Sequence, residues 1–172
     1  MPVLKEYAEK CSHITEFGVN AANSTAALLA GFPQTMRSYD IQTLKELHEA
    51  GDLEFLLEAA QENNIDFQFI NKSSVQIEIE PTDLLFIDTW HVYLQLIQEL
   101  RLHYSKVRRY IIVHDTEIFK DKDIRINYRN EESPGRGLMT AINDFLNEHS
   151  EDWRIKKHYT NNNGLTILER IS

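Results

Sequence analysis

Cysteine, long apolar runs and basic residues are all scarce in this sequence, and each shortage excludes something. Cys11 is the only cysteine, so no internal disulfide can form, which suits a reducing compartment. No stretch approaches the roughly 18 consecutive apolar residues of a membrane-spanning helix, and the first ten residues, MPVLKEYAEK, lack the apolar core of a signal peptide. We therefore expect a cytoplasmic protein that has no membrane partner.

Basic residues are outnumbered by acidic ones, since 18 Lys and Arg stand against 27 Asp and Glu, and the net charge is −9. Nucleic acids and anionic lipids carry charge of the same sign, so we expect neither as a partner. Hydrophobic residues make up 42% of the 172 positions, which is enough for a real core. This length is that of one ordinary domain, and we expect residues 1–172 to form a single domain.

Two periods of hydrophobic residues alternate along the chain, and they predict strands and helices in turn. The predicted strands are 13–19, 35–41, 67–70, 83–88, 109–114, 153–160 and 165–171. The predicted helices are 3–11, 24–30, 43–62, 91–104 and a segment that contains Leu138, Ile142, Phe145 and Leu146. Strands that alternate with helices favour parallel pairing with right-handed crossovers. We therefore predict an α/β fold: a three-layer Rossmann-like sheet of seven strands, mostly parallel, with a C-terminal antiparallel hairpin strand.

Local signals indicate where several of these elements begin and end. Asn23 is expected to cap the helix at its start, Gly31 to stop it, and Gly51 to break the segment 43–62. The run NNNG at 161–164 predicts a hairpin turn, because Asn and Gly tolerate positive φ.

Open parallel sheets bind ligands beyond the carboxyl ends of their strands, so the residues at those ends are the first candidates for a site. Gly18 ends the first predicted strand and allows a tight turn and a close ligand. Asp40 ends the second strand, and an acid about 20 residues beyond such a glycine can accept hydrogen bonds from ribose hydroxyls. A plain strand-to-helix turn and a helix cap are the alternatives. Taken together with the strand order, the two residues favour a nucleoside-containing ligand.

The next two strand ends carry a set of metal-ligating side chains. Asp88 ends one predicted strand, and His114 and Asp115 end the next, so parallel pairing would place all three at one rim. Two carboxylates and an imidazole suit a divalent ion, Mg²⁺ or Mn²⁺ more than a structural zinc. His91 follows at the start of a helix and could serve as a general base. The alternative is that Asp88 caps this helix, His91 is solvated and Asp115 begins a turn.

Three further features of the sequence are weaker evidence for a site. The polar segment 116–135 follows the strand that ends in His114 and should lie over the same rim, as a binding loop or as ordinary surface. Trp90 could stack on a ligand ring or simply pack. The remaining histidines are expected to be structural: His13, His48, His103, His149 and His158.

The segments that contain these residues carry a resemblance to a known family. They read TEFGV, SYDI, PTDLLFIDTWHVY, YIIVHDTE and YTNNNGLTILER, and they span most of the chain. With them the chain resembles a class I S-adenosylmethionine-dependent methyltransferase. More narrowly it is similar to small metal-dependent sugar O-methyltransferases and to cephalosporin-hydroxylase-like proteins. The implied fold is the seven-stranded methyltransferase sheet with an antiparallel last strand.

The resemblance also implies which residues bind the cofactor, S-adenosyl-L-methionine. The methionine part would lie at the end of the first strand, the ribose at the acid after the second strand, and the adenine at the segment after the third strand, which here lacks the usual acid. The implied cofactor-binding residues are Glu16, Gly18, Asn20, Ser24, Asp40, Ser73 and Asp88.

By the same resemblance, a divalent metal would be held by Asp88, His114 and Asp115, and His91 with Asp88 would be catalytic. His114 stands where the similar proteins have an acid. Because an imidazole carries no negative charge, the resemblance implies weaker binding of Mg²⁺ here.

The function implied is O-methylation of a small, possibly sugar-like acceptor with the help of Mg²⁺ or Mn²⁺. The alternative is a non-catalytic binding module with the same fold, motivated by Ala21 and Ala22 in place of a second glycine. A nicotinamide dehydrogenase would need a fuller glycine motif and would not explain the terminal hairpin. A homo-oligomer is left open, since a sheet edge could pair with a second copy but no heptad or large apolar stripe is present.

Overall fold

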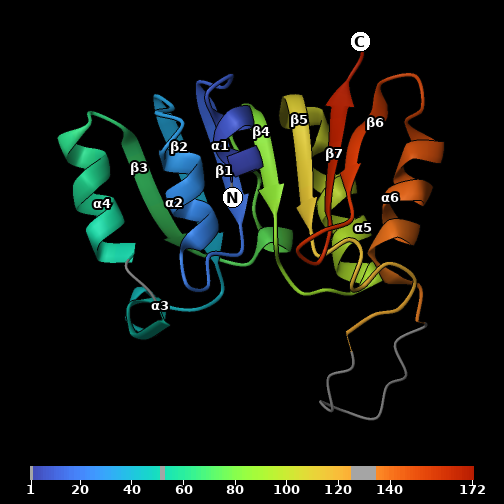
Figure 1. The fold of residues 1–172 in the computed structure, drawn as a ribbon, viewed down its shortest axis with the longest axis horizontal. Helices are drawn as coiled ribbons and strands as arrows, with labels where there is room; N and C mark the ends of the chain where they lie inside the picture. Colours follow the sequence, from blue (N-terminus) through green and yellow to red (C-terminus); the bar gives the residue numbers. More distant parts are fainter. Residues whose placement is uncertain (1, 51–52, 125–134) are drawn as a thin grey trace.

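The computed structural model describes residues 2–50, 53–124 and 135–172 (Figure 1). The strands are β1 (His13–Phe17), β2 (Thr35–Asp40), β3 (Asp66–Asn71), β4 (Thr82–Ile87), β5 (Val107–His114), β6 (Trp153–Tyr159) and β7 (Leu165–Arg170). The α-helices are α1 (Pro2–Ala8), α2 (Asn23–Leu29), α3 (Leu44–Ala50), α4 (Leu53–Glu62), α5 (Tyr93–His103) and α6 (Gly137–Glu148). Two short 3₁₀ turns, η1 (Ser74–Gln76) and η2 (Tyr104–Lys106), complete the set.

All seven strands form one sheet in the order β3-β2-β1-β4-β5-β7-β6. The first five strands pair in parallel, and β7 is antiparallel to both of its neighbours. The chain builds outward from β1 to β3 and then returns to place β4 on the other side of β1, so the strand order reverses between β1 and β4. The predicted α/β sheet with its C-terminal hairpin is therefore confirmed, and ligands of such sheets bind at this point of reversal.

Helices cover both faces of the sheet: α1, α2 and α4 lie on one face, and α5 and α6 on the other (Figure 1). Strand β4 shows why its sequence is almost continuously apolar. Leu84 and Phe86 pack in the core beneath α1 and α2, whereas Leu85 and Ile87 pack beneath α5 and α6. A central strand that is buried on both faces needs apolar residues at every position rather than at every second one.

Two expectations about helix ends are corrected or refined. Asn23 does not cap α2, because the N-cap is Ala22 in a left-handed conformation (φ 59°) and no side chain accepts a hydrogen bond there. The expected helix 43–62 is two helices, α3 and α4, and Gly51 itself lies outside the described residues. Within the described ranges, no helix has the length and apolarity that a membrane span requires.

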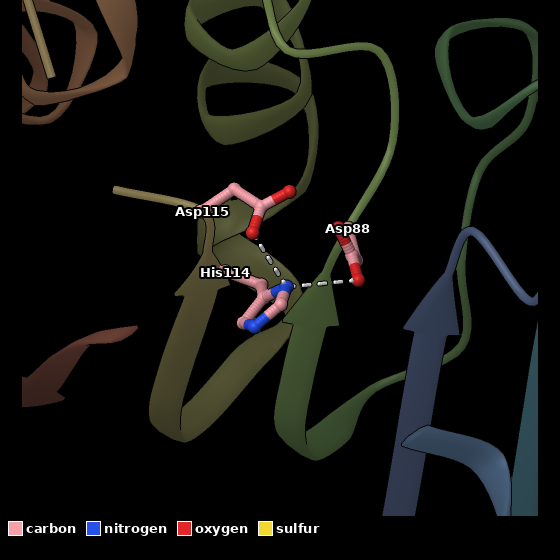
Figure 2. A group of neighbouring side chains, drawn as sticks. All are labelled: Asp88, His114 and Asp115. Carbon is pink, nitrogen blue, oxygen red and sulfur yellow. Dashed lines mark hydrogen bonds and ion pairs between the residues drawn. The ribbon is translucent and has the colours of Figure 1, made fainter. Parts of the chain in front are cut away.

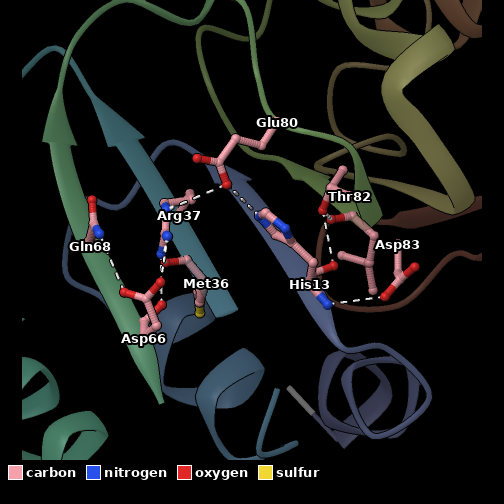
Figure 3. A network of polar contacts seen from close by, with 9 residues as sticks. His13, Met36, Arg37, Asp66, Gln68, Glu80, Thr82 and Asp83 are labelled. Atoms are coloured by element: carbon pink, nitrogen blue, oxygen red, sulfur yellow. Dashed lines mark hydrogen bonds and ion pairs between the residues drawn. The ribbon is translucent and has the colours of Figure 1, made fainter. Parts of the chain in front are cut away.

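A polar network lies toward the amino-terminal ends of the strands, at the opposite rim from the predicted site (Figure 3). Buried Arg37 of β2 donates to the Asp66 carboxylate on β3 at 2.6 Å and lies 3.9 Å from Glu80. Asp83 accepts hydrogen bonds from the backbone of Ser12 and His13. These contacts join neighbouring strands at the rim where β1 begins.

Gly18 marks the place where the loop after β1 touches the end of β4. It adopts φ +85°, and a Cβ placed on it would lie 2.0 Å from the carbonyl oxygen of Asp88. Glycine is required here by the backbone conformation and by the neighbouring strand end alike.

We expect the substitution Gly18→Ala to lower the free energy of unfolding by about 3 kcal/mol or more, because strain and a backbone clash add together. Gly135→Ala is the matched control, since Gly135 also has a positive φ (+60°) but a Cβ added there would have no atom within 4 Å. The control should lose only about 1 kcal/mol. Urea denaturation of both variants measures the difference, and equal losses would contradict the close approach.

Candidate active site at the carboxyl ends of β4 and β5

The register of β4 against β5 brings the predicted metal-ligating residues together. Ile87 pairs with Val113 in a parallel ladder, so the next residues along the two strands, Asp88 and His114, emerge side by side. Asp115 follows directly, and the side chains of all three point toward one another (Figure 2). The expectation that these residues share one rim is confirmed.

With His91 these residues form a closed ring of four side chains. Nε2 of His91 lies 3.2 Å from Oδ1 of Asp88 and 2.8 Å from Oδ2 of Asp115. Nδ1 of His114 lies 3.1 Å from Oδ2 of Asp88 and 3.2 Å from Oδ1 of Asp115. Each carboxylate therefore gives one oxygen to each imidazole.

The N-cap of α5 is Val92, so Asp88 does not cap this helix and that part of the alternative is wrong. Asp115 does begin a turn, because its carbonyl oxygen accepts a hydrogen bond from the backbone nitrogen of Phe119 at 3.1 Å.

The opposite charges within the ring shift the pKa values of Asp88, His91 and His114. Burial alone would raise the pKa of Asp88, but hydrogen bonds with His114 and His91 outweigh it and lower the pKa to about 2. Burial would lower the pKa of His91, but its contacts with Asp115 and Asp88 raise it to about 9. The hydrogen bond with Asp88 likewise raises the pKa of His114, against the effect of burial. At neutral pH His91 is therefore a cation beside two carboxylates.

Asp115 has two unusual features. Its backbone is left-handed (φ 58°), which is uncommon outside glycine and is enriched at functional sites. Its side chain is buried, with only 9% of the residue exposed, and Oδ1 has no hydrogen-bond partner although it lies near His114. A buried carboxylate oxygen without a hydrogen bond is costly unless something else contacts it. One donor atom from each of Asp88, His114 and Asp115 lies within 4.8 Å of the others, so these residues fit a metal ion.

The described part of the segment 116–135 lies over this rim, as predicted. The ring of Phe119 stacks on the imidazole of His91 with centroids 4.7 Å apart. Oδ1 of Asp123 accepts hydrogen bonds from the backbone nitrogens of Tyr93 and Gly137, so this acid caps α5 and also binds the start of α6. The remainder of the predicted loop, 125–134, lies outside the described residues.

The turn between β6 and β7 contacts the residues that follow Asp115. The carbonyl oxygen of Asn163 accepts hydrogen bonds from the backbone nitrogens of Glu117 at 2.8 Å and Ile118 at 3.0 Å. Gly164 packs so closely that a Cβ there would lie 2.3 Å from the nitrogen of Glu117. The run 161–164 is therefore the predicted hairpin turn, and it also holds the residues that follow Asp115.

Glu16 and Ser24, which are expected to line the methionine part of the cofactor, are both buried. Glu16 is fully buried, and its carboxylate accepts hydrogen bonds from three hydroxyls, those of Ser24 (2.7 Å), Thr25 (2.8 Å) and Ser38 (2.6 Å). Burial raises the pKa of Glu16 to about 7, and the three hydroxyls counteract this effect. Glu16 thus joins the start of α2 to β2 beneath the loop.

Asp40 and Asn20 remain at the surface of the predicted cofactor cleft. Oδ2 of Asp40 accepts hydrogen bonds from the backbone nitrogens of Val19 at 2.8 Å and Asn20 at 3.3 Å, and Oδ1 accepts one from Gln42 at 2.8 Å. A carboxylate offers about four lone pairs, so Asp40 can hold the loop and still accept a ligand hydroxyl. Asn20 is exposed beside it, and Gly18 lies between this loop and Asp88.

Sequence reasoning missed Glu99, a second fully buried carboxylate. Its Oε1 accepts hydrogen bonds from Ser74 at 2.5 Å and Gln95 at 2.8 Å, and its Oε2 accepts one from Thr89 at 2.9 Å. Glu99 therefore ties the segment after β3, where half-buried Ser73 lies, to the segment that follows Asp88. A signal existed, because an acid lay within the otherwise apolar buried stripe of a predicted helix.

Trp90 is 53% exposed and lines the same small pocket as Asp88, His91 and His114. Its ring is not part of the core, so the packing alternative for Trp90 is wrong. An exposed indole beside the ring of four side chains is available to a ligand.

Comparison with known proteins bears on the fold. No protein-family model and no curated protein matches the sequence. Solved structures do match. An O-methyltransferase from Bacillus cereus in complex with SAH has a TM-score of 0.60 at 16% identity, over 99% of this chain and 80% of that chain. A putative caffeoyl-CoA O-methyltransferase from Staphylococcus aureus has a TM-score of 0.65 at 12% identity, over 98% and 81%.

A third structure is the O-methyltransferase TomG from Streptomyces achromogenes in complex with SAM, with a TM-score of 0.64 at 13% identity, over 99% of this chain and 79% of that chain. At identities this low, the structural similarity establishes the fold alone. The chemistry has to be argued from the residues of this chain. The protein therefore has the fold of class I S-adenosylmethionine-dependent methyltransferases, as the resemblance implied.

The buried position of Glu99 predicts how stability varies with pH. Burial raises its pKa to about 7 in the folded chain, whereas an unfolded glutamic acid titrates near about 4.3. The folded state then holds the proton more tightly, so the free energy of unfolding falls as pH rises from about 4 to about 7. We expect Glu99→Gln to flatten this fall by roughly 1–3 kcal/mol.

Urea denaturation at about pH 5 and pH 7.5 measures the effect, with Glu62→Gln on the exposed surface of α4 as the control. The control should keep the slope of the original protein. A slope that Glu99→Gln leaves unchanged would show that Glu99 is ionised in the fold at both pH values.

Proposed function

We propose that this protein transfers the methyl group of S-adenosylmethionine to a hydroxyl group of a small molecule, with the help of a divalent metal ion. The observation that carries the proposal is the contact between two strand ends. The loop at Gly18, where a cofactor of this fold lies, packs directly on the backbone of Asp88, which belongs to the ring of four side chains. A methyl donor on that loop would face these ionisable groups. Proteins of similar structure, O-methyltransferases in complex with SAH or SAM, support the same chemistry.

The cofactor brings a reactive sulfonium methyl group, so the protein has mainly to align the acceptor and remove its proton. In this proposal Asp40 accepts hydrogen bonds from the ribose hydroxyls, while Gly18 and Asn20 border the methionine part. Ser73 borders the adenine, on a segment that Glu99 holds in place through its neighbour Ser74.

The metal-ligating residues in the proposal are Asp88, His114 and Asp115, and a bound divalent ion would lower the pKa of the acceptor hydroxyl. His91 is placed to take the proton, since its Nε2 lies at the same rim. It can do so only as a neutral imidazole, a form that positive charge at the two carboxylates favours. Trp90 would contact the acceptor beside this ring, which suits a sugar or aromatic ring face.

Cofactor binding is tested by calorimetry with S-adenosylmethionine. We expect Asp40→Ala to weaken binding at least tenfold, because hydrogen bonds to a charged group contribute about 1.5–3 kcal/mol. Asp66→Asn is the control, since Asp66 lies at the opposite rim with Arg37 and its loss should change the affinity less than twofold. Absence of heat from the original protein at millimolar cofactor would instead favour a module that does not bind it.

The metal part of the proposal predicts the behaviour of Asp115→Asn, a substitution chosen because asparagine tolerates the left-handed backbone. Release of S-adenosylhomocysteine with a panel of sugars and phenols should lose its stimulation by Mn²⁺ and Mg²⁺. Binding of S-adenosylmethionine should stay within a few-fold, because Asp115 follows β5, which is not a neighbour of β1 and its loop. Activity of the original protein that is the same with a chelator as with metal would contradict the metal role.

A further inference from the structure

We infer that the three inward-facing donors at this rim select a first-row transition ion, with Mn²⁺ and Co²⁺ bound in preference to Mg²⁺. The inference rests on the metal site of the proposed function and specifies which ion that site takes. It concerns the donor atoms of this chain and does not depend on the identity of the acceptor.

The first support is the spacing of the donor atoms. Nδ1 of His114 lies 3.1 Å from Oδ2 of Asp88 and 3.2 Å from Oδ1 of Asp115. In an octahedral site with bonds of about 2.1 Å, two ligands at right angles lie about 3 Å apart. The nitrogen of His114 therefore stands at the ligand spacing from both carboxylate oxygens.

The second support is the oxygen of Asp115 that faces this position. Oδ1 is buried and makes no hydrogen bond, and its ion-pair contact is with Nδ1 of His114 at 3.2 Å. A divalent ion held between these two atoms would give this oxygen a full ligand bond where burial removes it from water. Oδ1 belongs to the same carboxylate whose other oxygen lies 2.8 Å from His91.

The third support is the different role of His91. Its Nε2 contacts the oxygen of each acid that does not face His114, namely Oδ1 of Asp88 and Oδ2 of Asp115, and its ring stacks on Phe119. Metal-binding carboxylates are commonly oriented by such outer hydrogen bonds. His91 therefore orients the two acids, and His114 is left as the one nitrogen among the three inward donors.

Donor chemistry then decides the metal. Mg²⁺ favours oxygen ligands and keeps much of its water, whereas imidazole suits first-row transition ions, and the affinity of a site with nitrogen and oxygen donors rises from Mn²⁺ to Co²⁺. A set of two carboxylates and one imidazole should therefore bind Mg²⁺ less tightly, and the transition ions more tightly, than a set of three carboxylates. Replacing the imidazole by a third carboxylate should reverse this difference in affinity.

The experiment is calorimetry of Mg²⁺, Mn²⁺ and Co²⁺ with the full chain and two variants. The original protein should bind Mn²⁺ at least tenfold more tightly than Mg²⁺, and Co²⁺ more tightly still. His114→Asp should narrow the ratio of Mn²⁺ to Mg²⁺ to threefold or less. His149→Asp, the same change at the far end of α6, is the matched control and should keep the original ratio.

A spectroscopic measurement, made on the original protein and on variants, identifies the nitrogen directly. Electron spin echo modulation of bound Mn²⁺ should show a coupled ¹⁴N nucleus in the original protein, in His149→Asp and in His91→Gln, and should lose it in His114→Asp. Absence of ¹⁴N coupling in the original protein would overturn the inference, as would equal affinities for Mn²⁺ and Mg²⁺. Binding of S-adenosylmethionine, measured in parallel, separates these results from failure of the proposed methyl transfer, since it does not require the selectivity.

Discussion

The parallel pairing of β4 with β5 is the constraint on which the candidate site depends. Both strands are buried on both faces, and the pairing of Ile87 with Val113 fixes their register. A slip of one residue would turn every side chain of a strand to the opposite face, at the expense of the whole core. Asp88 and His114 thus meet because the apolar residues before them cannot be placed otherwise. The chemistry of the rim is positioned by packing of the sheet.

Around this rim, two buried carboxylates hold the loop segments together. Glu16 binds three hydroxyls from α2 and β2, and Glu99 binds side chains from the segments after β3 and β4. Each holds loop segments by polar contacts that the core shields from water. Gly18 is then the one position where the loop requires a residue without a side chain, since the carbonyl of Asp88 fills the space.

The sheet and the meeting of Asp88 with His114 could be predicted because strand periodicity and parallel order decide where strands end. The ring itself could not be predicted, since it depends on the angle at which His91 enters above the sheet and on the stacking of Phe119. The burial of Glu16 could not be predicted either, because an acid two positions before the glycine that ends a strand is typical of a ligand contact. Capping of α5 by Asp123 comes from a residue thirty positions away in sequence, which no local signal reports.

The contact of the turn at Asn163 with the residues after Asp115 also orders the events of folding. β7 enters the sheet between β5 and β6, although it follows both of them along the chain. During synthesis from the N-terminus, the first five strands can pair while the turn that contacts Glu117 does not yet exist. The contacts of Asn163 with Glu117 and Ile118 therefore form only when the last hairpin docks.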